Sequence, residues 1–166
     1  MAVVVTVKYV KYVKHRAGPD RLPPSMTPSP QYWIMKSEPS AYSFADLLRD
    51  GETHWDGVRN YQARNNMKAM AVGDWVLFYE SMGPKELVGV AQVSKAHYPD
   101  PTDDTGRWVW VNIKPVTALQ QHVSLADIKS DNRVNQISLV TQSRLSVLPL
   151  DKPAFDHLLK LGKTNL

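Results

Sequence analysis

The chain has 166 residues, 43% of them hydrophobic and 22% charged, which is long enough for one globular domain with a real core. It contains no cysteine, which excludes a disulfide framework, a thiolate zinc site and a thiol nucleophile, and is compatible with a reducing compartment. No run of about 18 apolar residues occurs, so we expect no membrane-spanning helix.

The formal charge of +4 belongs to the first 30 residues. These carry five basic side chains against the single carboxylate of Asp20, whereas residues 31–166 carry 15 basic and 15 acidic side chains. A neutral domain does not hold long duplex nucleic acid through bulk electrostatics. A nucleic-acid partner would therefore need a local pocket with a few phosphate contacts.

Residues 1–30 differ in composition from the rest of the chain. They begin with the short repeat VKYVKYVK and end in a stretch rich in proline. This composition predicts a disordered, basic and proline-rich extension over residues 1–30, followed by one domain over residues 31–166. A functional start at Met26 and a transit peptide are the alternative interpretations.

The first half of the domain reads as a strand followed by two helices. An apolar run at residues 32–36 predicts a strand that ends before Pro39. Ser43 and Asp46 form a capping pattern for a helix that ends at Gly51, and residues 61–70 show helical spacing. We expect the buried side chains of these helices to be Phe44, Leu47, Leu48, Ala63, Met67 and Met70.

The second half alternates strands and short helices. Residues 75–79 and 87–96 predict a hairpin, in which Gly89 indicates a bulge or a close backbone approach. A loop at 98–106 precedes a strand at 107–114, and the remaining predicted elements are short helices after Ser124 and at 135–140, a strand at 144–148 and a helix at 151–161. Curved strands interrupted by short helices, without a βαβ rhythm, favour an α+β domain on a small barrel of about five or six strands.

Residues 55–66, WDGVRNYQARNN, are unusually polar for a segment of a core. They contain Trp55, Tyr61, two arginines, one carboxylate and four side-chain amides. Aromatic faces, amides and guanidinium groups are the groups that bind an unstacked nucleobase and its phosphate. The alternative interpretation is a solvated loop leading into a helix, with Trp55 closing the edge of the core.

Other site chemistries find little support. The five histidines show no metal-binding helical spacing, and neither a Gly-x-Ser-x-Gly sequence nor a glycine-rich phosphate loop is present, so we expect no metal, no cofactor and no enzyme of these classes. Glu38 and Asp56 would suit an acid/base pair, but nothing nearby supplies a nucleophile or electrophile. We therefore favour a cap or salt bridge for one of them and ligand recognition for the other.

Five ordered motifs carry a resemblance to a known family: residues 32–39 (YWIMKSEP), 55–66, 72–79 (VGDWVLFY), 98–102 (YPDPT) and 143–147 (SRLSV). Together they resemble the EVE domain family. The chain is similar, more distantly, to the YTH readers of methylated adenine. The resemblance implies a PUA-like fold and binding of a modified cytosine or adenine in DNA or RNA rather than catalysis.

The resemblance also implies which residues form the site. In the YTH pattern, Trp55 corresponds to a cage tryptophan, and the loop that holds Tyr98 supplies the opposite wall. The expected base-binding pocket consists of Trp55, Tyr98, Ser37, Glu38, Asp56, Asn60, Tyr79 and Ser81. The expected phosphate contacts are Lys36, Arg59, Arg64 and Arg144. We expect a monomer located in the cytoplasm, or in the nucleus of a eukaryote.

Overall fold

One mixed β-sheet of six strands organises residues 28–166, the part of the chain that the computed structural model describes. The strands are β1 (Tyr32–Ser37), β2 (Thr53–His54), β3 (Trp75–Glu80), β4 (Glu86–Pro99), β5 (Val109–Ser124) and β6 (Val147–Leu150). The helices are α1 (Phe44–Asp50), α2 (Tyr61–Ala69), α3 (Leu125–Ser130), α4 (Ser138–Thr141) and α5 (Lys152–Leu161). Most of the predicted extension at residues 1–30 lies outside the described residues.

The order of strands in the sheet is β2-β5-β4-β3-β1-β6. Strands β1 and β3 are parallel, and the other neighbours are antiparallel. Shifts of register between β4 and β5, and between β3 and β4, bend the long strands as β-bulges do. The α+β class and the number of curved strands are confirmed, and the sheet stays open between its edge strands β2 and β6.

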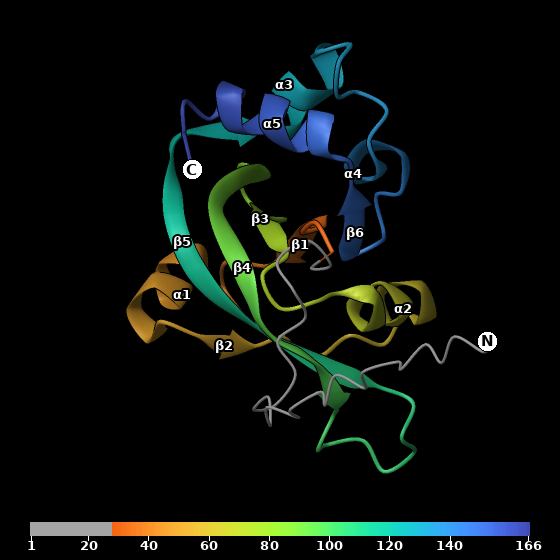
Figure 1. The fold of residues 1–166 in the computed structure, drawn as a ribbon. Coiled ribbons are helices and arrows are strands. Elements are labelled where there is room, and N and C mark those ends of the chain that lie inside the picture. Colours follow the sequence, from red (N-terminus) through yellow and green to blue (C-terminus); the bar gives the residue numbers. More distant parts are fainter. Residues whose placement is uncertain (1–27) are drawn as a thin grey trace, which may run out of the picture.

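The helices cover the two ends of this curved sheet. In Figure 1, α3 and α5 lie at one end, whereas α1, β2 and α2 lie towards the other. Helix α1 begins with the predicted capping box of Ser43 and Asp46 and ends at Gly51, whose φ of 77° is left-handed. Leu48, predicted to be buried, is instead 48% exposed, because α1 turns only Phe44 and Leu47 into the core.

Gly89 on β4 explains how α1 reaches the sheet. A Cβ atom at this position would lie 2.3 Å from the Phe44 ring, so only glycine leaves room for that ring. Phe44 then packs edge-on against Phe78 of β3, with ring centroids 5.4 Å apart. Of the two alternatives predicted at Gly89, the bulge is present, as register shifts beside this residue, and the space above its backbone is filled by the Phe44 side chain.

Several predicted boundaries were wrong, including that of β5, which was predicted at 107–114 and spans Val109–Ser124. Tyr98 was predicted in a loop but belongs to β4, where its register partner is Trp110 of β5. The two-residue strand β2 was not predicted, and β6 begins at Val147 rather than at residue 144. Pairing between distant segments decides these boundaries, and local propensity carries no information about it.

Two negative findings hold for residues 28–166. No helix in this part of the chain is long and apolar enough to cross a membrane. Within the same residues, no group of three or more His, Cys, Asp or Glu side chains is placed to hold a metal ion.

Candidate nucleic-acid interface

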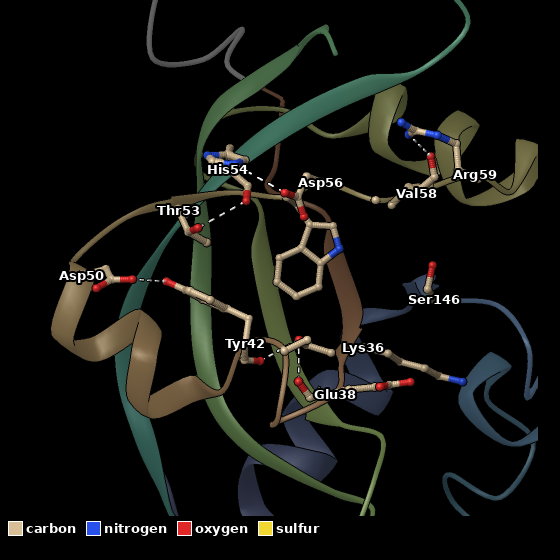
Figure 2. Close-up of a pocket in the computed structure, with 14 residues that line it drawn as sticks. Lys36, Glu38, Tyr42, Asp50, Thr53, His54, Asp56, Val58, Arg59 and Ser146 are labelled. Carbon is tan, nitrogen blue, oxygen red and sulfur yellow. Dashed lines mark hydrogen bonds and ion pairs between the residues drawn. The ribbon is translucent and has the colours of Figure 1, made fainter. Parts of the chain in front are cut away.

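A cavity of about 610 Å³ lies where β1 ends and β2 leads into the loop before α2 (Figure 2). Its size is within the usual range of small-molecule sites. Residues in the ranges 36–42 and 50–59 form its walls together with Ser146, which is distant from both in sequence. The lining residues are Lys36, Ser37, Glu38, Ala41, Tyr42, Asp50, Thr53, His54, Trp55, Asp56, Gly57, Val58, Arg59 and Ser146.

Trp55 is both a wall of this cavity and part of the hydrophobic core. Its side chain is only 7% exposed and packs edge-on against Phe78, with ring centroids 5.6 Å apart. The backbone N–H of Trp55 donates to the carbonyl of Val111 on β5, at 2.7 Å. Trp55 therefore closes the edge of the core, as one interpretation of the sequence expected, and also forms part of a cavity wall.

Tyr42 is an aromatic lining residue that the sequence did not single out. It lies just before the Ser43 cap of α1, and its hydroxyl donates to Asp50 at 2.9 Å (Figure 2). Ser37 donates to the backbone carbonyl of Tyr42 at 2.6 Å, which ties α1 to the end of β1. Burial raises the pKa of the Tyr42 phenol, so this hydroxyl stays protonated near neutral pH and remains a donor.

The two carboxylates discussed from the sequence, Glu38 and Asp56, both line the cavity and are both exposed. Asp56 lies 3.5 Å from Nε2 of His54, whose ring stacks on Trp110 at a centroid distance of 4.2 Å. His54 and Thr53 form the two-residue strand β2, which is too short to leave a pattern in the sequence. The hydroxyls of Ser37 and Ser146 also line the cavity, but within residues 28–166 neither carboxylate is hydrogen-bonded to them, and Ser37 donates to the Tyr42 carbonyl instead.

A second cavity of about 360 Å³ shares Lys36, Glu38 and Ser146 with the first. The side chain of Lys36 runs between the two, donates to the carbonyl of Ser143 at 2.8 Å, and lies 5.9 Å from the centre of the Tyr79 ring. Burial lowers the pKa of the Lys36 ammonium group from its usual value. The predicted site residues Tyr79, Ser81 and Arg144 line this second cavity.

Tyr98 does not join Trp55, contrary to the expected cage. It is not among the residues that line the first cavity. Its hydroxyl donates to Asn112 at 2.5 Å, and its ring lies edge-on to Trp110 at 6.2 Å. The β4–β5 pairing holds Tyr98 on the ribbon, and Tyr42 is the aromatic side chain that shares the cavity with Trp55.

The remaining predicted contacts have structural partners of their own. Asn60 caps α2 by accepting from the backbone N–H of Ala63 at 2.9 Å, and with Arg144 it lines a shallower third cavity of about 330 Å³. Arg59 lines the first cavity and forms an ion pair with the buried Asp100, with Nη2 and Oδ2 3.0 Å apart. Arg64 lies outside the lining of all these cavities.

The curved sheet with short helices at its ends has a PUA-like fold, as predicted. The YTH domain of the Zygosaccharomyces rouxii MRB1 protein, solved in complex with N6-methyladenosine RNA, shares this fold with a TM-score of 0.55. The identity is 16%, covering 90% of this chain and 94% of that one, so this likeness concerns the fold alone. Residues 31–161 match the EVE domain, and the chain belongs to the EVE domain family.

Known relatives agree with this assignment. The chain is 32% identical over 164 residues to thymocyte nuclear protein 1 of Homo sapiens, covering 78% of this chain and 73% of the human protein. A hypothetical protein from Leishmania major has a TM-score of 0.77 at 35% identity, covering 81% and 96% of the two chains. The human THYN1 protein, solved in complex with 5-methylcytosine containing DNA, has a TM-score of 0.74 at 30% identity, covering 82% and 99%.

Proposed function

We propose that this protein binds a nucleic acid that carries a modified cytosine or adenine, and that the modified base enters the cavity at Trp55. The observation that carries the proposal is the cavity itself: a buried tryptophan and a tyrosine, with exposed carboxylates and a hydroxyl at its border. Stacking on an aromatic side chain contributes about 1 to 3 kcal/mol per base. The DNA complex of the human relative supports the same class of ligand.

Polar groups at the border of the cavity suit recognition of a base edge. Glu38 and Asp56 accept hydrogen bonds from an exocyclic amino group, and the Ser37 hydroxyl, which donates to the Tyr42 carbonyl, keeps its acceptor lone pairs. A base paired in a duplex has to leave the stack to reach such a cavity, whereas an unpaired base enters directly. This arrangement favours binding over catalysis, because the described residues show no hydroxyl of the lining hydrogen-bonded to Glu38 or Asp56 as a general base.

Phosphate contacts are assigned to the basic side chains around the cavities. Lys36 separates the first two cavities, Arg144 lines the second, and Arg59 lies at the border of the first. Residues 31–166 have no net charge, so a few such contacts beside a pocket replace a broad basic surface. We expect the protein to act as a monomer in the cytoplasm, or in the nucleus of a eukaryote.

The test is a set of single strands of one sequence, with 5-methylcytosine, N6-methyladenine or neither, made as DNA and as RNA. Fluorescence anisotropy at fixed salt gives a dissociation constant for each strand. We expect one modified strand to bind about tenfold or more tightly than its unmodified partner, which corresponds to about 1.4 kcal/mol. Equal affinity across the whole set would contradict the proposal.

A further inference from the structure

A cluster of two aromatic rings and two guanidinium groups lies on the surface beside the first cavity. The rings of Tyr61, the first residue of α2, and Trp108 have centroids 5.1 Å apart. The Arg64 guanidinium lies 4.8 Å from the centre of the Tyr61 ring and 5.9 Å from that of Trp108, and Arg59 lies 5.5 Å from Trp108. We call Arg59, Tyr61, Arg64 and Trp108 the Trp108 platform.

The loop that carries Trp108 is held in place by its own carboxylates. Asp103 accepts hydrogen bonds from the backbone N–H groups of Thr105, Arg107 and Trp108, at 2.9 to 3.0 Å. The buried Asp100 holds Arg59 over the Trp108 ring through their ion pair. The platform is therefore ordered without a ligand, which lowers the entropic cost of binding one.

Tyr61 has no role in the core that would explain its position. Its side chain is 54% exposed, although Ala63 and Met67 of the same helix are fully buried. The guanidinium groups of Arg64 and Arg107 form no ion pair with another residue in the range 28–166, whereas Arg59 is paired with Asp100. The platform thus presents a half-exposed tyrosine ring beside the Arg64 guanidinium, which is hydrogen-bonded to the Asn65 side chain and the Arg107 carbonyl but has no carboxylate partner among residues 28–166.

Arg59 connects the platform to the cavity, because it lines the cavity and also stacks over Trp108. We propose that the Trp108 platform binds the nucleotide adjacent to the modified base, in a single-stranded segment. Its base stacks on Tyr61 and Trp108, and Arg64 contacts its phosphate. This inference rests on the proposed function, and it adds where the nucleotide next to the modified base is bound.

The chemistry favours a nucleic-acid strand as the occupant. Every nucleobase has a π-face, so stacking on an aromatic ring tolerates any neighbouring sequence. A guanidinium fork matches the geometry of phosphate and also stacks on planar rings. The platform should therefore add affinity without discriminating between bases, and the cavity should provide the discrimination.

The test compares a modified nucleoside with a short oligonucleotide that carries the same modified base at its centre. For Tyr61→Ala we expect about fivefold to a hundredfold weaker binding of the oligonucleotide and unchanged binding of the nucleoside. Tyr61→Phe keeps the ring and should bind the oligonucleotide as the unaltered protein does. Arg64→Gln should also weaken oligonucleotide binding, and Arg133→Gln, a change at an exposed arginine that lines a different cavity, controls for its loss of one charge.

Two results would overturn the inference. In the first, Tyr61→Ala leaves the affinity for the oligonucleotide unchanged. In the second, Tyr61→Ala lowers the affinity for the nucleoside and for the oligonucleotide by the same factor. Failure of the proposed function looks different: the unaltered protein would then show no preference for modified strands. In that case binding of unmodified single strands still tests the platform, because Tyr61→Ala should weaken it by the same factor.

Discussion

Trp55 illustrates how one residue serves the core and the cavity together. Its ring packs edge-on against Phe78 and is almost fully buried, yet it also lines the cavity. A side chain in this position is rigid, because its other contacts fix its rotamer. A ligand base that stacks on Trp55 would therefore gain contact area without having to order a mobile side chain.

Two substitutions at Trp55 separate its roles. Trp55→Ala should lower the free energy of unfolding by about 3 to 5 kcal/mol, since it leaves a void against Phe78. Trp55→Phe keeps an aromatic ring in the core, so we expect a smaller loss of stability and about tenfold weaker binding of the modified strand. Urea unfolding and anisotropy titration measure the two effects.

Trp75→Phe is the matched control, because Trp75 lines a different cavity and packs near Phe155. We expect the Trp75→Phe protein to be less stable than the unaltered protein and to bind the modified strand with the same affinity. If Trp55→Phe binds the modified strand as tightly as the unaltered protein, Trp55 is only a core residue, and the base-binding role assigned to it is wrong.

At the scale of elements, α1 contacts β4 closely because residue 89 is a glycine and has no side chain. An alanine Cβ at position 89 would lie 2.3 Å from Phe44, a distance at which the ring has to move. We expect Gly89→Ala to lower the free energy of unfolding by about 1 to 3 kcal/mol. Equilibrium unfolding in urea measures this change in the free energy of unfolding.

The partner variant is Phe44→Leu, which shortens the side chain that occupies this space. Added to Gly89→Ala, it should recover part of the lost stability, so that the double variant loses less than the sum of the two single variants. If the losses of stability in the two single variants are strictly additive, overlap with Phe44 is not the reason why Gly89→Ala is destabilising.

The loop between β4 and β5 depends on ionised carboxylates. The Thr105 hydroxyl, together with backbone N–H groups, holds the pKa of Asp103 well below its usual range, and Thr102 does the same for Asp100. A folded-state pKa below the unfolded value of about 3.9 means that the stabilisation is complete above that value. It is lost as the pH falls from about 4 towards the folded-state pKa.

We therefore expect Asp103→Ala to lower the free energy of unfolding by the same amount at pH 7 and pH 5. Below about pH 4 the difference from the unaltered protein should shrink, because protonation removes the same interactions there. Urea unfolding at several pH values measures this, and Asp104→Ala, a change at the exposed neighbouring carboxylate, is the control. A difference that stays constant down to pH 3 would contradict the assignment.

At the scale of the whole molecule, charge and predicted specificity lie in different parts of the chain. Residues 1–30 hold the formal excess of +4, whereas every residue of the cavities belongs to the neutral remainder. Lysines near phosphate add affinity that depends on salt and ignores sequence. Discrimination between bases requires contacts to the base itself.

Deletion of residues 1–30 should therefore leave a folded domain that prefers the modified strand as before. The contact of Gln31 with Asp74, at 2.9 Å, stays in the truncated chain. We expect weaker binding of modified and unmodified strands alike at low salt, and a smaller salt dependence. Isotherms at two salt concentrations measure this, and loss of the preference would show that residues 1–30 help to form the base pocket.

Most of the helices and strands were predictable because their causes are local. The Ser43–Asp46 capping box, the Gly51 stop and the spacing of Ala63 and Met67 lie within a few residues of what they determine. Leu48 and Tyr98 were misplaced because burial and pairing depend on distant segments.

The sequence by itself determined the family resemblance, the neutral domain and the polar, aromatic character of residues 55–66. Only the tertiary structure decided which of these side chains meet. Lys36 and Ser146 are neighbours because β1 pairs with β6, and Tyr42 shares a cavity with Trp55 because Gly89 admits Phe44. A cavity wall is assembled from segments far apart in the chain, and the pairing that joins them leaves no local pattern in the sequence.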